Sequence, residues 1–297
     1  MMRILPEQGS VARIMQLSKS IAILLAGLIS TLAGPAFAEP PGRVVSMNLC
    51  TDQLVLMLAD PGQVVSVSYL AARAQDSLLA NQTEGLILNH GQAEEVLPLK
   101  PDLVVAGIYT TRFTVQIMKQ RSIPVLDLPP AENFEDVRSN IRAVAMALGV
   151  KERGEALITQ MDQRISDLSA RVSGQPQSRA LIYREGGYTL GPDTFAGALL
   201  TLAGYRNVAT DYGVQKWGAV PVEAVLQLKP ELLVVGVYRQ NAPSLARDVT
   251  EHPALRHRMP RIVEVPTRHW ACGTPAALDI VERLIDQRES FLAKRPS

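Results

Sequence analysis

The segment AEEVLPLKPDLVVAGIYTTR, residues 93–112, recurs later in the chain as VEAVLQLKPELLVVGVYRQN, residues 222–241. The two copies align without a gap, and both contain the Lys-Pro pair, a glycine and a tyrosine at matching places. Each copy predicts a short amphipathic helix that ends at the Lys-Pro pair, followed by a buried strand with Gly and Tyr at its carboxyl end. One repeat at so long a spacing indicates a duplicated lobe and not a solenoid.

Residues 1–38 are predicted to be a secretory signal peptide. Basic residues precede an apolar run at 21–32, which ends in Ala36-Phe37-Ala38, a small-x-small cleavage pattern. The run is shorter than the roughly 20 residues that a membrane span needs. Met15 is an alternative start, because the basic region before Lys19 is unusually long.

Composition excludes several classes of protein. The chain of 297 residues has a formal net charge of +1, and a balance so close to zero gives no support for nucleic-acid binding, which needs a basic face. Its two cysteines are too few for a disulfide scaffold, so the core must form by apolar burial. This length fits two modest domains.

Strands alternating with helices predict a mainly parallel sheet in each lobe, covered on both faces. The first lobe begins with a strand at 43–48 that leads into a helix, whereas residues 81–91 show no clear pattern. Helical spacing from Lys151 to Val172 predicts the longest helix, placed between the repeat copies as an interlobe strut. The predicted fold is therefore α/β: two Rossmann-like lobes joined by one long helix, with an N-terminal lobe at 39–148, the interlobe helix at 149–175 and a C-terminal lobe at 176–297.

Motifs for phosphate-binding loops, dinucleotide binding and the hydrolase nucleophile elbow are missing from the sequence. The four histidines are scattered, so we expect no metal site and no cofactor. His269 and Cys272 leave open the alternative of a secreted cysteine-dependent enzyme. Cys50 and Cys272 each follow a strand near the predicted cleft; we expect two partly buried free thiols there, with a disulfide as the alternative.

Aromatic and arginine side chains gather after the predicted strands of both lobes. Ligands of open parallel sheets bind beyond the carboxyl ends of the strands. Rings and guanidinium groups there predict a cleft for a large, partly planar, anionic ligand. The expected ligand-binding residues are Tyr69, Arg73, His90, Tyr109, Arg112, Arg184, Tyr188, Trp217, Tyr238, Arg239 and Trp270.

The chain resembles a known family in several features taken together. They are a predicted signal peptide, two lobes with a central helix, the opening RVVSMN, the paired EEVLPLKPDLV-type segments and a late strand followed by Trp270. The chain is similar to the class III periplasmic substrate-binding proteins of ABC importers, the receptors for ferric siderophores and cobalamin. Trp270 matches a ligand-facing tryptophan of the cobalamin receptors, whereas His90 stands where those receptors carry a tryptophan. The two cysteines are not part of the family's best-known pattern.

The resemblance implies a monomeric periplasmic receptor that performs no chemistry on its ligand and delivers it to an inner-membrane permease dimer. It favours an iron complex, a ferric siderophore, as the ligand, with cobalamin or haem as the alternative within the class. In that family a glutamate of each lobe docks on the permease, and Glu94 and Glu223 fall on the matching positions.

Overall fold

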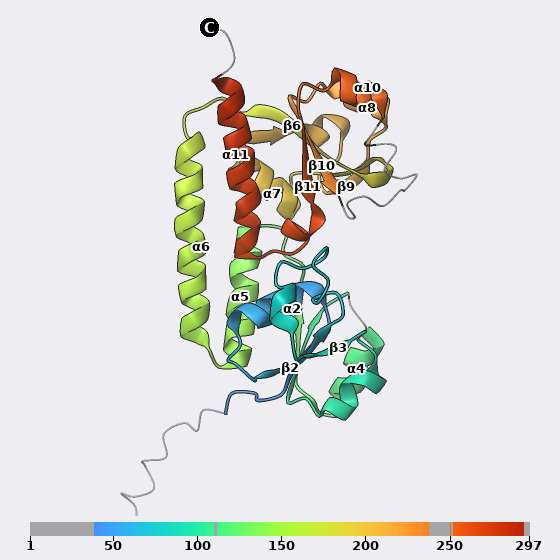
Figure 1. Cartoon of the computed structure of the whole chain (residues 1–297), viewed down its shortest axis with the longest axis vertical. Coiled ribbons are helices and arrows are strands. Elements are labelled where there is room, and N and C mark those ends of the chain that lie inside the picture. Colours follow the sequence, from blue (N-terminus) through green and yellow to red (C-terminus); the bar gives the residue numbers. More distant parts are fainter. Residues whose placement is uncertain (1–38, 110–111, 238–249, 251, 294–297) are drawn as a thin grey trace, which may run out of the picture. The chain divides into compact units, whose positions relative to one another are not determined.

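The computed structural model describes residues 39–109, 112–237, 250 and 252–293 (Figure 1). The predicted signal peptide therefore lies outside the described residues. From Pro40 onward the chain forms one compact unit, which contains two sheets. Among the described residues, no helix has both the length and the apolar character needed to cross a bilayer.

The first sheet has five strands in the order β3-β2-β1-β4-β5, and every pairing in it is parallel. The edge strand β3 lies in the segment that shows no sequence pattern. The strands are β1 (Val44–Ser46), β2 (Val64–Ser68), β3 (Ile87–Asn89), β4 (Leu103–Gly107) and β5 (Val125–Leu128). The helices of this lobe are α2 (Leu49–Leu58), α3 (Ala93–Val96), α4 (Arg112–Gln120) and α5 (Phe134–Leu148).

In the described part of the second lobe the sheet has six strands, with β11-β10-β6-β7-β9 as the main order and β8 paired with β6. Strands β8, β10 and β11 run parallel to their neighbours, whereas β7 and β9 pair antiparallel. The strands are β6 (Ser178–Arg184), β7 (Tyr188–Leu190), β8 (Tyr205–Asn207), β9 (Trp217–Ala219), β10 (Leu232–Val237) and β11 (Ile262–Pro266). The helices are α7 (Phe195–Leu202), α8 (Val222–Leu228), α10 (Pro253–Arg258) and α11 (Leu278–Leu292). The two sheets confirm the predicted fold class.

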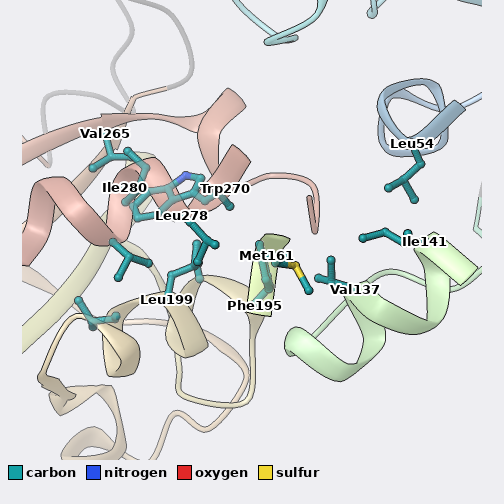
Figure 2. Close-up of a cluster of buried hydrophobic side chains, with 14 of the residues drawn as sticks. Leu54, Val137, Ile141, Met161, Phe195, Leu199, Val265, Trp270, Leu278 and Ile280 are labelled. Carbon is teal, nitrogen blue, oxygen red and sulfur yellow. The ribbon is translucent and has the colours of Figure 1, made fainter. Parts of the chain in front are cut away.

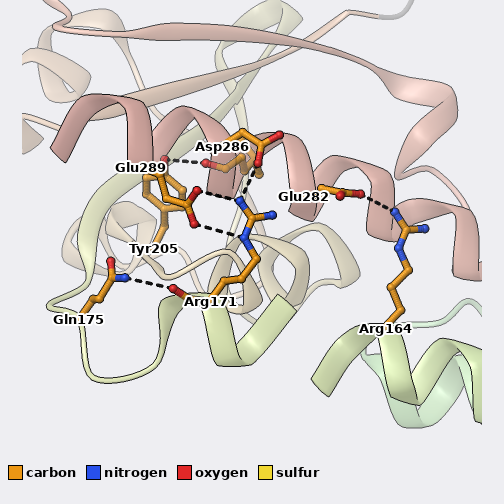
Figure 3. A network of polar contacts seen from close by, with 8 residues as sticks. Arg164, Arg171, Gln175, Tyr205, Glu282, Asp286 and Glu289 are labelled. Carbon is orange, nitrogen blue, oxygen red and sulfur yellow. Dashed lines mark hydrogen bonds and ion pairs between the residues drawn. The ribbon is translucent and has the colours of Figure 1, made fainter. Parts of the chain in front are cut away.

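The predicted strut is α6 (Lys151–Val172), which has 22 residues and so extends for roughly 33 Å. It runs beside α5 and then beside α11 (Figure 1). Arg171 on α6 pairs with Asp286 at 2.7 Å and with Glu289 at 2.8 Å, both on α11 (Figure 3). The strut is thus one of three packed helices, with charged contacts on its exposed side.

The sequence repeat is also a repeat of backbone geometry. Lys100 and Lys229 both adopt left-handed backbone conformations, with φ values of 48° and 46°. Helices often end in this conformation, and glycine is its usual occupant because a side chain makes it costly. Arg43 donates to the carbonyl of Leu99 at 2.7 Å, and Arg179 donates to the carbonyl of Leu228 at 2.7 Å. These matched caps support a duplicated αβ unit.

The largest hydrophobic cluster is continuous from one lobe to the other. It includes Leu54 and Ile141 of the first lobe, Met161 of the strut, and Phe195 and Leu199 of the second lobe (Figure 2). Separate smaller clusters lie on the far side of each sheet. A shared core of this kind resists independent movement of the lobes.

Candidate ligand-binding cleft

A chain of four hollows follows the carboxyl ends of the strands of both sheets, and neighbouring hollows share residues. Together we call them the cleft. The floor pocket, of about 170 Å³, touches α2, α5 and the ends of β4 and β5, and also reaches Ala271 and Gly273 of the second lobe. The Trp217 pocket, about 320 Å³, shares Pro130, Ala131 and Ala271 with it.

Two further hollows extend the cleft into each lobe. The Tyr188 pocket, about 200 Å³, is joined to the Trp217 pocket through Arg184. The Arg112 pocket, about 230 Å³, shares Gly107 and Ile108 with the floor pocket. The cleft therefore spans both sheets at the strand ends, where ligands of open α/β sheets bind.

Several predicted aromatic residues line this cleft with much of their surface free. Tyr109 is 72% exposed in the floor pocket, Trp217 is 68% exposed in its pocket, and Tyr188 is 60% exposed. Arg184 and Arg112 line the cleft as well, and neither has an ion-pair partner within the described part of the chain. Exposed rings beside unpaired guanidinium groups suit a ligand with flat apolar faces and polar or anionic edges.

Tyr69, Arg73 and His90 form a separate cluster beyond the ends of β2 and β3. The rings of Tyr69 and His90 stack with centroids 4.7 Å apart, and the Arg73 guanidinium lies 5.9 Å from the Tyr69 centroid. Arg73 also pairs with Asp76 at 2.9 Å, and His90 Nδ1 lies 2.9 Å from Glu95. Within the described part of the chain, the residues that line the four hollows do not include Tyr69, Arg73 or His90, so a role for these three in ligand binding stays a prediction.

Trp270 lies deeper than the resemblance implies. It is only 6% exposed and belongs to the large core cluster with Val265, Leu278 and Ile280 (Figure 2). A Cβ at Gly236 would lie 3.1 Å from the Trp270 ring, so the glycine lets the ring pack against β10. Trp270 still lines the Trp217 pocket, with the small part of its surface that is exposed. Tyr238 and Arg239 lie outside the described residues.

Cys50 and Cys272 form a disulfide with Cα atoms 5.1 Å apart, which corrects our expectation of two free thiols. Cys50 lies at the start of α2 and lines the floor pocket, while Cys272 follows β11. The bond removes the thiolate that a cysteine-dependent enzyme requires. Nδ1 of His269 has no hydrogen-bond partner among the residues that the structure describes, and burial, followed by the charge of Arg268, lowers the pKa of its ring.

Two polar contacts cross between the lobes near the disulfide. Glu132, after β5, forms an ion pair with Lys216, just before β9. Arg268 donates to the carbonyl of Ala74 at 2.6 Å and so holds the loop that carries Arg73. The two lobes are therefore joined at the rim of the cleft by the ion pair, the hydrogen bond and the disulfide. Lys216 and Glu132 were not predicted, because ordinary charged loop residues carry no sequence signal for such a role.

A buried polar network lies behind the floor of the first lobe. Ser68 donates to the carboxyl of Asp52 at 2.5 Å through its hydroxyl and at 3.2 Å through its backbone. Asp52 is fully buried, and this burial raises its pKa to about 7. Asn89, the last residue of β3, donates to Ser66 in the middle of β2 at 2.8 Å and to the carbonyl of Ser46, the last residue of β1, at 2.9 Å. The network fixes the strand ends that frame the cleft.

Among the described residues, no group of three His, Cys, Asp or Glu side chains is arranged to hold a metal ion. The cleft offers rings, guanidinium groups, amides and hydroxyls, together with the single carboxylates of Asp127, Glu132 and Glu185 in three different hollows. It is suited to recognising a ligand by shape and hydrogen bonding.

Two α/β lobes with a binding cleft along their strand ends define a two-lobed ligand receptor. The chain belongs to the periplasmic binding protein family, whose model matches residues 44–258. A cobalamin-binding protein of Halobacterium salinarum is 27% identical over 257 residues, covering 82% of this chain and 68% of that protein.

Solved structures share the fold. A periplasmic vitamin B12 binding protein of Vibrio cholerae superposes with a TM-score of 0.66 at 19% identity, covering 86% of this chain and 99% of the other. A periplasmic heme binding protein from Pseudomonas aeruginosa gives a TM-score of 0.67 at 22% identity, covering 82% of this chain and 91% of the other. Both neighbours are similar in fold to this chain from the first lobe to the second.

Proposed function

We propose that this protein is the substrate-binding receptor of an ABC importer and that its ligand is a corrinoid. The observation that carries the proposal is the cleft itself, a run of connected hollows of 170 to 320 Å³ each that crosses from one lobe to the other. A ligand that fills such a run must be large. The relative of this chain in Halobacterium salinarum is named a cobalamin-binding protein. That name favours a corrinoid as the ligand over the ferric siderophore that we expected from the sequence.

The receptor delivers its cargo to an inner-membrane permease and performs no reaction on it. Residues 1–38 direct the chain to the periplasm. The binding groups are the exposed rings of Tyr109, Tyr188 and Trp217, which pack on flat faces of the ligand, and Arg184, which donates to its polar edge.

A second candidate ligand is an anionic iron chelate, either a ferric siderophore or haem. Arg112 and Arg184 line the cleft and form no ion pair with any residue that the structure describes, and two such positive charges favour an anionic ligand. Salt dependence separates the candidates, because screening weakens the attraction between guanidinium groups and a charged ligand far more than contacts with a neutral one.

The test is titration of the purified protein with cyanocobalamin, haemin and a ferric catecholate siderophore, followed by tryptophan fluorescence and calorimetry. We expect cyanocobalamin to bind with a Kd of about 1 µM or less, and Arg184→Ala to weaken binding about tenfold. Arg121→Ala, an exposed arginine at the end of α4 outside the cleft, is the matched control. Binding of haemin or the siderophore without any binding of cyanocobalamin would overturn the corrinoid assignment.

A further inference from the structure

The floor pocket differs in chemistry from the other three hollows. Each of the other hollows includes an arginine, whereas the residues that line the floor pocket carry no ionisable side chain except the phenol of Tyr109. Its walls combine apolar surface from Leu54, Ile108 and Leu128 with the polar groups of Thr51 and Asn140. A charged group placed there would lose its hydration without gaining a counter-charge, which is costly.

The pocket is held in shape before any ligand arrives. Thr51 Oγ1 lies 2.7 Å from Ser46 Oγ, and Asn140 donates to the carbonyl of Pro129 at 2.9 Å. These bonds fix two polar walls. The Oδ1 atom of Asn140 is an acceptor, so the same side chain offers a second hydrogen bond to a donor in the pocket.

The second lobe supplies the remaining wall through Ala271 and Gly273, on either side of Cys272. The disulfide to Cys50 ties this loop to α2. Gly273 also approaches Ala131 so closely that a Cβ at position 273 would lie 2.4 Å from the Ala131 side chain. The wall is therefore fixed by a covalent bond and by a contact that only glycine permits. Preformed pockets bind more strongly because less ordering is needed.

Size limits what can enter. The volume of about 170 Å³ is close to that of an apolar cavity of about 150 Å³ that takes up one benzene molecule. The pocket opens to the Trp217 pocket through the shared residues Pro130, Ala131 and Ala271. A group entering it therefore remains attached to a ligand that occupies the rest of the cleft.

We propose that the floor pocket is a subsite for an uncharged, ring-sized group that projects from the ligand and carries a hydrogen-bond donor. The inference rests on the proposed function, in that the group belongs to the same ligand. The cleft is then divided by charge. The ligand's polar or anionic edge faces the arginines, and a neutral arm enters the pocket bounded by Cys50, Thr51 and Asn140.

The test uses benzamide and benzoate, two probes of the same shape that differ in charge. Saturation-transfer NMR on the purified full protein should detect benzamide, and benzoate should bind at least about tenfold more weakly, because a carboxylate buried without a partner is disfavoured. Ile108→Trp fills the pocket from its partly exposed rim and should abolish the benzamide signal. Met146→Trp places the same ring on an exposed site of α5 and should leave the signal intact.

Thermal unfolding of each variant shows whether its fold is retained. If Ile108→Trp unfolds, Leu54→Phe supplies a second filling variant with a smaller added volume. Equal binding of the two probes, no binding of benzamide, or benzamide binding that survives both filling variants overturns the subsite.

Corrinoid binding is measured separately on the same variants. Failure of cyanocobalamin to bind the unaltered protein contradicts the proposed function, whereas the probe pair still decides the charge character of the pocket. If cyanocobalamin binds, we expect Ile108→Trp to weaken it about tenfold while Met146→Trp does not. An unchanged affinity in Ile108→Trp contradicts the subsite and leaves the proposed function standing.

Discussion

Cys50 and Cys272 are bonded to each other across the two lobes, with Cα atoms 5.1 Å apart and a sequence separation of 222 residues. The bond joins the first turn of α2 to the loop after β11 beside the floor pocket. A cross-link that closes so long a loop restricts the unfolded chain strongly.

Replacing both cysteines, Cys50→Ser with Cys272→Ser, should therefore lower the free energy of unfolding by about 2–4 kcal/mol. Urea unfolding of the variant and of the oxidised parent measures the difference, and the parent reduced with dithiothreitol is the control for the substitutions. Mass spectrometry after denaturing, non-reducing alkylation should find neither cysteine modified. Two alkylated thiols per chain would show that the bond does not form.

Ligand binding should change the tryptophan fluorescence mainly through Trp217. Trp217 is 68% exposed in the cleft, whereas Trp270 is 6% exposed, and the chain has two tryptophans. Ligand binding should quench the emission, and Trp217→Phe should remove most of this change. Tyr212→Phe, an exposed ring outside the four hollows, serves as the control. A full ligand response in Trp217→Phe would mean that the ligand does not reach Trp217.

The buried carboxyl of Asp52 should make stability depend on pH. Burial raises its pKa in the folded protein to about 7 from the usual 3.8, so between pH 3.8 and pH 7 the folded state retains the proton while the unfolded state loses it. The contribution to stability is fully present below pH 3.8 and declines as pH rises toward 7. Compared with Asp52→Asn, the parent should lose unfolding free energy between those values. Urea unfolding of both proteins across this range measures the effect, and two parallel pH profiles would contradict it.

The lobes should close only slightly on the ligand. The strut α6 packs beside α5 and α11, the hydrophobic core continues between lobes, and the disulfide adds a covalent tie. Each feature opposes the hinge motion that many periplasmic receptors use. Small-angle scattering with and without ligand should show a change of a few degrees of tilt at most. A marked contraction would contradict this prediction and would require a hinge outside these contacts.

Much of the fold follows from local sequence patterns. The strut has the same bounds, Lys151–Val172, that helical periodicity predicts, and the Lys-Pro pairs of the repeat become matched left-handed helix ends at Lys100 and Lys229. These features depend on residues close together in the chain, so sequence spacing reveals them. The short edge strand β3 was missed because its pairing with β2, and not its own pattern, defines it.

The site was only partly predictable, because proximity between distant segments determines it. An exposed ring after β4 is found at Tyr109, since an aromatic residue after a strand is visible in the sequence, whereas the exposed ring of Trp217 belongs to the first residue of β9. The burial of Trp270 depends on the absence of a side chain at Gly236, and the disulfide depends on how the two lobes meet. Periodicity contains no information about either contact.

Glu94 and Glu223 should dock the receptor on its permease. Both are exposed, and each lies in the first turn of the short helix, α3 or α8, that precedes the left-handed lysine of its lobe. One acid at a helix start needs no functional reason, because the helix dipole favours it there. Two acids at equivalent places in duplicated lobes present a nearly twofold pair of charges, which suits a transporter built from two equivalent permease subunits. Charge pairs of this kind mainly set orientation and association rate.

The double change Glu94→Ala with Glu223→Ala should abolish uptake in cells. It should leave ligand affinity nearly unchanged, since neither residue lines the cleft. Each single change should have a milder effect on uptake. Glu84→Ala with Glu152→Ala removes two other exposed acids and controls for the change in net charge. Normal transport by the docking double variant, or loss of its ligand affinity, would contradict the assignment.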